Sequence, residues 1–511
     1  MILENGTIRT MDEALPTTRA LAVAGDRVAG GIGTTELALP SPERVDLGGR
    51  CVLPGFTDAH VHFPSWALAR QQVQLETCST LAEALDRVGR HAAATETDWV
   101  RGGGWRTGDW QQATDPTSDD LDQVVSDRPA ALTSRDGHSL WLNSKALVLA
   151  SGELDAVGGI VERDGAGNPT GVLREQAAWQ FRDRFLTVDD ADVRDAMAEG
   201  IRVAHARGLV AVHDKDGGQR ALEHWQALAA RRKLSLRVWQ SLPVDRVKEL
   251  QELGVRSGFG DDFLRVGYLK VFMDGALGSA TAWRLDGSGT QLLERESLAE
   301  IVREAAAAGF PVAVHAIGDA ANREALAGLA DSRAAWNDRG LRPRIEHAQL
   351  LDPDDLPRFA ELGVAASVQF SHAPTDRELA DAAWPNHQGA YAYRSLAETG
   401  ALLVNGSDAP VEPLNPWGGV CAGVNRTLDS RPGWRTEQAL TIQQALAATT
   451  VAAPWLEGAE HRRGRLIPGM LADLVVVDRD PFSVPAEQLP SITIVATMVG
   501  GRWVHNPPPW N

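Results

Sequence analysis

The sequence predicts an α/β protein: a (β/α)8 TIM barrel, a small β-sandwich domain built from both termini, and an insertion after the first barrel strand. Three observations lead to this prediction. From about residue 200 onward, strand-like apolar runs alternate with helical patterns; both ends of the chain are β-rich; and residues 64–200 lack regular alternation. We therefore expect an N-terminal segment of the β-sandwich (1–50), the barrel (51–410, with 64–200 as an inserted lid or substrate segment), a helical end of the barrel (411–464) and a C-terminal segment of the β-sandwich (465–511).

The two ends of the chain are predicted to fold together. Short strand-like runs occur at residues 7–10, 20–24, 27–29 and 44–47 near the N-terminus, and at residues 473–478 and 492–499 near the C-terminus. Because neither end is long enough to fold alone, we expect them to pair into one small β domain.

The barrel is predicted from eight strand-like runs. The first lies within the apolar stretch 53–63, and the others cover residues 209–213, 236–242, 265–273, 311–315, 343–347, 364–370 and 401–405. Helical patterns lie between most of them, at residues 219–232, 297–308, 320–330 and 354–362, and two more helices are expected in the insertion at 81–94 and 188–207. A barrel of this kind carries its active site at the C-terminal ends of its strands.

Composition excludes several classes of function. The formal net charge is -18 and no basic run occurs, which argues against nucleic acid or an anionic membrane as a partner. The three cysteines, Cys51, Cys78 and Cys421, are too far apart in sequence for a disulfide framework or a Cys-x-x-Cys metal site. No targeting signal or membrane-spanning run is recognisable. We expect a cytoplasmic protein that acts on a small-molecule substrate.

The first barrel strand ends in Asp58-Ala59-His60-Val61-His62. Successive side chains of a strand point to opposite faces, so Asp58, His60 and His62 share one face. Two adjacent imidazoles can bind one metal ion, although such a pair taken alone is more often a pair of polar residues at a strand end.

Further polar residues recur at the ends of later strands. They are His213 after the second strand, Lys270 and Asp274 at the fourth, His315 at the fifth, His347 at the sixth and Asp408 just past the eighth. Each has an ordinary structural explanation by itself, such as a satisfied buried histidine or a turn aspartate. Their joint placement at one mouth favours a metal site instead, because several imidazoles and a carboxylate are the usual donors for Zn²⁺ or a similar ion.

Lys270 lies in the apolar context Tyr268-Leu269-Lys270-Val271-Phe272-Met273. Burial of a bare ammonium is costly unless the group is paired or chemically changed. Carbamylation by CO₂ would convert Lys270 into a carboxylate able to bridge two metals, and the alternative is an ordinary lysine paired with Asp274 or another acid.

These motifs together resemble the amidohydrolase superfamily, and within it the YtcJ-like branch that includes N-substituted formamide deformylase. The segments that carry the resemblance are 54–62, 132–139, 270–276, 314–319, 345–348 and 406–408, and it covers nearly the whole chain. It implies that the metal ligands are His60, His62, His315, His347 and Asp408, and that Lys270 occupies the position carbamylated in binuclear members. The implied cofactor is one or two Zn²⁺ ions, with another divalent metal left open, and the family also suggests a homodimer.

The expected activity is hydrolysis of a C–N bond, in an amide or an N-formyl or N-acyl amine, by attack of a metal-bound hydroxide. Metal binding lowers the pKa of water from about 15.7 to roughly 7. Asp408 would act as the proton carrier, and His347 or the metal would polarise the carbonyl. A metal-dependent deaminase or decarboxylase, and a non-catalytic metal-binding regulatory protein, remain alternatives.

Residues of the insertion are the expected contacts to substrate. Arg135, His138, Glu175 and Trp105 are candidates there, together with His213 of the barrel. Two of these have competing interpretations, because Arg135 could equally be a structural salt-bridge partner and tryptophans more often pack in cores. For His213, a position behind the substrate site is an equal alternative.

Overall fold

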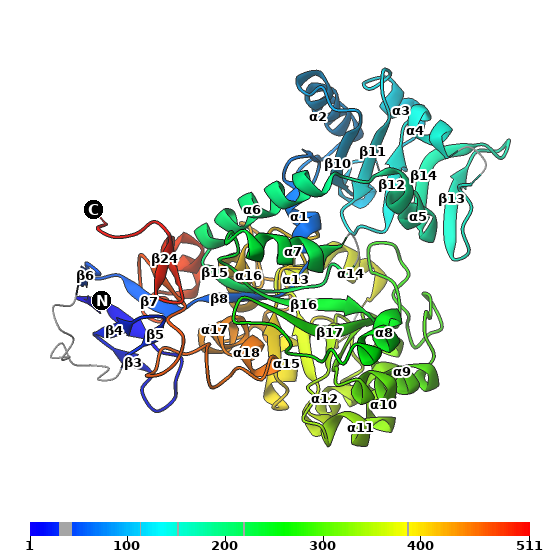
Figure 1. Ribbon diagram of the computed structural model, residues 1–511. Coiled ribbons are helices and arrows are strands. Elements are labelled where there is room, and N and C mark those ends of the chain that lie inside the picture. The colour runs from blue at the N-terminus through cyan, green and yellow to red at the C-terminus, as the bar shows by residue number, and fades with distance from the viewer. Residues whose placement is uncertain (30–42, 113, 151–152, 218–219, 386–387, 511) are drawn as a thin grey trace. The chain divides into compact units, whose positions relative to one another are not determined.

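The structure is a computed structural model that describes residues 1–510 except for 30–42, 113, 151–152, 218–219 and 386–387 (Figure 1). The chain divides into two compact units. One contains residues 1–63 and 198–511, and the other contains residues 64–197.

An eight-stranded parallel sheet forms the centre of the first unit, as the sequence predicts (Figure 1). Its strands are neighbours in chain order, so each βα unit adds one strand beside the previous one. They are β8 (Phe56–Val61), β15 (Leu209–Asp214), β16 (Arg237–Pro243), β17 (Leu264–Phe272), β18 (Val312–Ala316), β19 (Arg344–His347), β20 (Ala365–Val368) and β21 (Leu403–Asn405).

The sheet is nearly closed where the chain leaves β21 and meets the end of β8. Asp408 N donates to His60 O at 2.7 Å, and His62 N donates to Ala409 O at 2.9 Å. Gly406 lies at the point of closest approach, where an added Cβ would be 2.4 Å from His60 N. The absence of a side chain at Gly406 therefore allows the eighth strand to approach the first.

Helices connect the strands of the barrel, and those predicted from the sequence are present with ends shifted by a few residues. Gln219, where one predicted helix begins, lies outside the described residues. The helices are α6 (Asp190–Ala206), α7 (Ala221–Ala230), α8 (Val247–Glu252), α9 (Arg295–Ala307), α10 (Asp319–Asp331), α11 (Arg333–Asn337), α12 (Leu356–Leu362), α13 (His372–Thr375), α14 (Arg377–Ala383), α15 (Tyr393–Glu398), α16 (Pro416–Asn425), α17 (Ile442–Thr450) and α18 (Ala452–Leu456). Across the described residues, no helix is long and apolar enough to cross a membrane.

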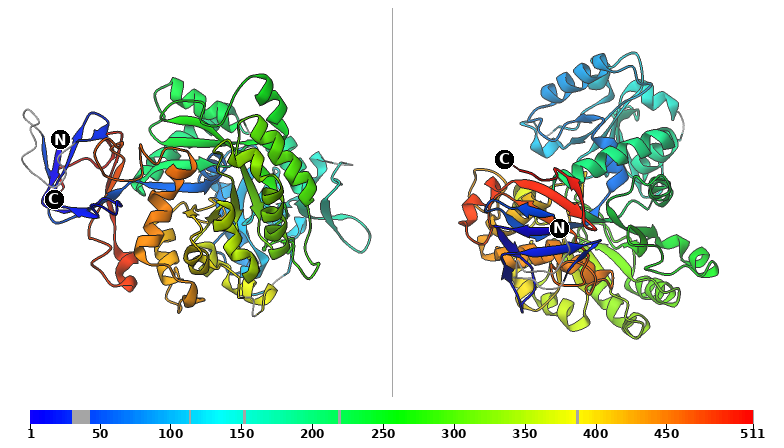
Figure 2. Two further views of the ribbon diagram at one scale, coloured as in Figure 1. Left: turned by 90° about the horizontal axis from the view of Figure 1, so that it is seen from below. Right: turned by 60° about the vertical axis from the view of Figure 1, so that its left-hand side comes forward.

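Both ends of the chain join in a β-sandwich, again as predicted (Figure 2). One sheet has the order β5–β4–β1–β6 and the other the order β24–β23–β22–β7–β2–β3, so strands from the two termini pair directly. The strands are β1 (Ile2–Glu4), β2 (Thr7–Arg9), β3 (Thr17–Thr18), β4 (Leu21–Ala24), β5 (Arg27–Val28), β6 (Arg44–Asp46), β7 (Cys51–Pro54), β22 (Leu474–Val477), β23 (Ile494–Val499) and β24 (Arg502–His505). Residues of both sheets, among them Leu21 and Val476, share one buried core.

The second unit has a six-stranded sheet of its own, in the order β13–β14–β12–β11–β10–β9. Its elements are α1 (Phe63–Ala69), β9 (Val73–Gln74), α2 (Leu81–Ala94), β10 (Val100–Trp105), α3 (Ser118–Asp122), β11 (Ala130–Ser134), β12 (Ser139–Leu142), α4 (Ser144–Leu149), β13 (Gly159–Arg163), β14 (Pro169–Glu175) and α5 (Gln176–Phe185). Trp105, Trp110 and Trp141 pack against one another in its core. The predicted helix 81–94 is α2, whose start is capped by the Thr80 side chain.

Candidate metal centre

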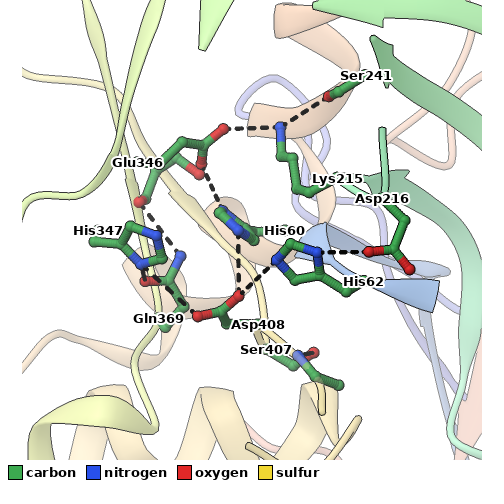
Figure 3. Close-up of polar contacts among 12 residues, drawn as sticks. His60, His62, Lys215, Asp216, Ser241, Glu346, His347, Gln369, Ser407 and Asp408 are labelled. Carbon is green, nitrogen blue, oxygen red and sulfur yellow. Dashed lines mark hydrogen bonds and ion pairs between the residues drawn. The ribbon is translucent and has the colours of Figure 1, made fainter. Parts of the chain in front are cut away.

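His60 lies on β8 and is fully buried at the mouth of the barrel (Figure 3). Its Nδ1 lies 2.8 Å from Glu346 Oε2 on β19. Nδ1–H therefore donates to the carboxylate, and Nε2 is the nitrogen left to face the mouth of the barrel. Nε2 lies 3.2 Å from Asp408 Oδ1, but it has no hydrogen-bond partner among the described residues.

His62, two residues after His60 and just past the end of β8, has a similar arrangement. Its Nδ1 lies 2.9 Å from Asp216 Oδ1, and its Nε2 lies 3.5 Å from Asp408 Oδ1. Burial would lower the pKa of His62, but Asp216 and Asp408 together raise it to about 10. The two rings are 5.6 Å apart at their centroids, so the His-x-His motif does bring two imidazoles together.

Asp408 is the point on which these side chains converge. It follows β21 in the left-handed backbone region, with φ 60°. Its carboxylate is also 3.9 Å from His347 Nδ1 and 3.8 Å from His372 Nε2. Although burial opposes ionisation, His60, His62 and His347 keep the pKa of Asp408 well below its ordinary value. The group is therefore an anion surrounded by imidazoles.

His347 ends β19 and turns toward the same point. Its Nδ1 lies 2.9 Å from Gln369 Oε1, and its ring centroid is 4.8 Å from that of His60. Burial and the neighbouring His315 hold the pKa of His347 well below its ordinary value, so the ring is neutral, which is the form that binds metal. Donor atoms of His60, His347 and Asp408 all lie within 4.8 Å of one another.

His315 and Lys270 lie beside this group. His315 on β18 has its ring centroid 4.6 Å from that of His347, while its Nε2 is 2.9 Å from Gly275 O. Lys270 is only 8 % exposed. Burial lowers the pKa of Lys270, and the nearby negative charges of Glu346 and Asp408 oppose that effect.

Asp274, the alternative partner considered for Lys270, has another role. Its carboxylate accepts hydrogen bonds from the backbone N–H groups of Ile317 and Gly318, at 3.0 Å and 2.8 Å, and from Trp283 N at 3.0 Å. Asp274 therefore shapes the loop after β18.

A buried charged group behind His60 was missed by sequence reasoning. Glu346 Oε1 lies 2.8 Å from Lys215 Nζ (Figure 3). It also lies 2.8 Å from Arg344 Nε, and all three side chains are fully buried. Two cations thus hold one carboxylate in the orientation that contacts His60. The scarcity of lysine was a usable signal for Lys215, because only five lysines occur in the chain.

His372 and Gln369 were also missed. Both follow β20, the seventh strand, in the segment Gln369-Phe370-Ser371-His372. The signal was available, since polar residues past a barrel strand face the mouth. The His372 ring is parallel to that of His347, with centroids 6.2 Å apart.

Two predicted substrate residues are placed elsewhere by the structure. His213 is fully buried, with Nε2 2.7 Å from Glu457 Oε1 and Nδ1 3.1 Å from Arg344 Nη1. Both ring nitrogens therefore have protein partners, which favours the alternative that His213 lies behind the substrate site. Trp105 is 2 % exposed and its Nε1 donates to Leu132 O, so it is a core residue of the second unit.

The other substrate candidates lie in the second unit, where His138 and Glu175 are in contact. His138 Nδ1 is 2.8 Å from Glu175 Oε2, and Arg135 lies 3.6 Å from Asp109. Glu175 has φ 50°, a backbone conformation that costs free energy for a residue with a side chain. Their contact with substrate stays a prediction.

The donor set fits a divalent metal ion. It contains a carboxylate anion, neutral imidazole in His347, and a buried His60 Nε2 without a hydrogen-bond partner among the described residues. Glu346, Asp216 and Gln369 hold the other nitrogens of the three imidazoles, which is the outer-shell arrangement of metal-binding histidines. Imidazole and carboxylate donors suit Zn²⁺ and several other divalent metals.

Comparisons with known proteins agree with this geometry. Residues 43–505 match the model of the amidohydrolase family. The putative amidohydrolase YtcJ of Bacillus subtilis is 29% identical over 99% of this chain and 99% of its own length. The N-substituted formamide deformylase of Arthrobacter pascens is 28% identical over 98% of this chain and 97% of its own. Protein LONG AFTER FAR-RED 3 of Arabidopsis thaliana is 30% identical over 99% of this chain and 91% of its own.

Solved structures with similar folds include two uncharacterised metal-dependent hydrolases. The protein from Pyrococcus horikoshii OT3 superposes with a TM-score of 0.77 at 27% identity, over 95% of this chain and 99% of its own. The protein from Pyrococcus furiosus gives a TM-score of 0.75, also at 27% identity, over 94% of this chain and 99% of its own.

Proposed function

Because this chain belongs to the amidohydrolase family, we propose that it is a metal-dependent hydrolase that cleaves a C–N bond in an amide or an N-formyl or N-acyl amine. The observation that carries the proposal is the convergence of His60, His62 and His347 on the Asp408 carboxylate. The names of two relatives, an amidohydrolase and an N-substituted formamide deformylase, support this bond type.

His60, His62, His347 and Asp408 would hold the first ion, for which we propose Zn²⁺. His62, whose pKa is raised by Asp216 and Asp408, would release the proton on Nε2 when the ion binds. His315 and Lys270 lie beside them and would complete the set, with a carbamylated Lys270 serving a second ion if one binds. When bound, the metal lowers the pKa of water and polarises the carbonyl of the substrate.

The residues of the chain supply proton transfer and orientation. Asp408 is ionised and carries the proton from the attacking water to the leaving nitrogen, so that an amine and a carboxylate are released. His347 faces the same point as a neutral ring. Glu346 and Gln369 keep the imidazoles of His60 and His347 in one orientation, so that little reorganisation is needed during reaction.

Elemental analysis and activity of three variants test the proposal. We expect about one to two equivalents of zinc in the wild type, and a loss of both metal and activity in His60→Ala. Asp408→Asn should lose activity and keep more of its metal than His60→Ala does. The exposed His461→Ala is the matched control and should behave as the wild type.

Activity assays on a panel of possible substrates distinguish the reaction classes. N-formyl and N-acyl amines should release an amine and a carboxylate. Release of ammonia from an aminated ring, with no amide cleavage, would identify a deaminase instead. Absence of metal from the wild type, or metal content unchanged in His60→Ala, would contradict the metal-centre assignment.

A further inference from the structure

His372 is a polar side chain at the centre that the proposed mechanism does not use. It begins the short helix α13, the next helix after β20, and the residue is 4 % exposed. Its Nε2 has no hydrogen-bond partner among the described residues and lies 3.8 Å from Asp408 Oδ2. A buried polar atom without a partner costs free energy, so a group that binds in the site would relieve the cost.

The other ring nitrogen determines where the hydrogen lies. Gln349 Nε2, which can only donate, is 3.0 Å from His372 Nδ1. Nδ1 is therefore the acceptor, which places the ring hydrogen of His372 on Nε2. A nitrogen that bears hydrogen is not a metal ligand, so His372 is a hydrogen-bond donor facing the site.

The ring is also packed in this orientation. It lies parallel to the His347 ring, at an interplanar angle of 4°. Gln349, which sets its tautomer, is 4 % exposed, and Gln349 O accepts a backbone hydrogen bond from Tyr391 at 2.6 Å. A fixed donor that faces a reacting group acts most strongly on charge that develops during the reaction.

We propose that His372 is a further catalytic residue, which donates its Nε2–H to the carbonyl oxygen of the substrate amide and to the oxyanion that this oxygen becomes. The inference rests on the proposed function. The hydrogen stays on His372 throughout, while Asp408 carries the proton of the water to the leaving nitrogen. The residue thus favours substrates with a carbonyl oxygen next to the bond that is cleaved.

The test compares His372→Leu and His372→Gln with the wild type on an N-formyl amine. Loss of one donor to an oxyanion lowers kcat by about 100- to 1,000-fold. We expect a fall of this size in His372→Leu with KM changed much less and metal content unchanged. His372→Gln keeps an N–H donor, so it should retain more activity, and it serves as the informative variant if the leucine variant does not fold.

A substrate with sulfur in place of the carbonyl oxygen distinguishes hydrogen-bond donation by His372 from a purely structural role. The thioformyl analogue has a weak acceptor in place of the carbonyl oxygen, so His372→Leu should lose much less relative to the wild type on this substrate. An equal loss on both substrates, an unchanged kcat on the N-formyl amine, or metal lost in parallel with activity would overturn the inference. A wild type without metal or amide cleavage would instead overturn the proposed function itself.

Discussion

At the scale of the residue, Glu346 connects the candidate metal centre to the interior of the barrel. It is adjacent to His347 in sequence, but its side chain contacts His60, which is far away along the chain, at 2.8 Å. The same carboxylate neutralises Lys215 and Arg344. Because none of these groups reaches water, each depends on the others for both charge balance and hydrogen bonding.

Glu346→Gln tests this dependence. The amide keeps the shape but removes the charge, so we expect metal affinity to fall about 10- to 100-fold. The free energy of unfolding should fall by about 3–5 kcal/mol, because Lys215 and Arg344 lose their buried partner. Ser241→Ala is the control, since Ser241 accepts a hydrogen bond from the Lys215 end of the group, at 3.4 Å, and leaves the Glu346 charge in place. Metal titration and thermal unfolding measure the two effects, and equal behaviour of both variants would refute the role of Glu346.

At the scale of the element, the junction of the first and eighth strands determines the position of the centre. His60 belongs to β8 and Asp408 follows β21, and backbone hydrogen bonds between their segments bring the two together. Asp58 Oδ1 strengthens the junction by accepting Ser407 N at 2.9 Å and His60 N at 3.1 Å. Burial raises the pKa of Asp58 to about 7, against the lowering effect of the hydrogen bonds with Ser407 and His60.

Gly406→Ala should open this junction. The new methyl group would meet His60 N at 2.4 Å and His60 Cα at 2.8 Å, both of which are too close. The strands must separate, so we expect a destabilisation of about 1–3 kcal/mol together with weaker metal binding. Gly165→Ala is the control, because its Cβ would meet nothing within 4 Å. Unchanged metal content and melting temperature in Gly406→Ala would show that the junction tolerates the methyl group.

At the scale of the whole molecule, a buried polar chain runs through the first unit. It passes from Arg463 and Glu457 through His213 to Arg344, and then through Glu346 to His60. Burial alone would raise the pKa of Glu457, but Arg463 and the hydrogen bond from His213 lower it to about 2. Burial lowers the pKa of His213 to about 4, so its ring is neutral near pH 7.

The free energy of unfolding should therefore fall on acidification over a defined range of pH. The pKa of Glu457 is lower in the folded state than its ordinary value of 4.5, so its stabilisation is complete above pH 4.5 and disappears as the pH falls toward 2. The contribution at pH 7 is about 3 kcal/mol. In thermal unfolding, the melting temperature of Glu457→Gln should lie well below that of the wild type at pH 7 and closer to it at pH 3. The melting temperature of the exposed control Glu296→Gln should equal that of the wild type at both pH values. A gap that stays constant with pH would contradict this assignment.

The sequence alone determined the order of the barrel strands and the residues at their ends. Period-two alternation placed His60 and His62 on one face, and the alternation of strands and helices brought His347 and Asp408 to the same mouth, because both rules depend on local pattern and chain order. The tertiary structure decided the rest. Packing of side chains from distant segments determines the contact of Glu346 with His60, the tautomer of His372, and the burial of His213 and Trp105. No periodicity in the sequence encodes which buried polar atoms lie within hydrogen-bonding distance of one another.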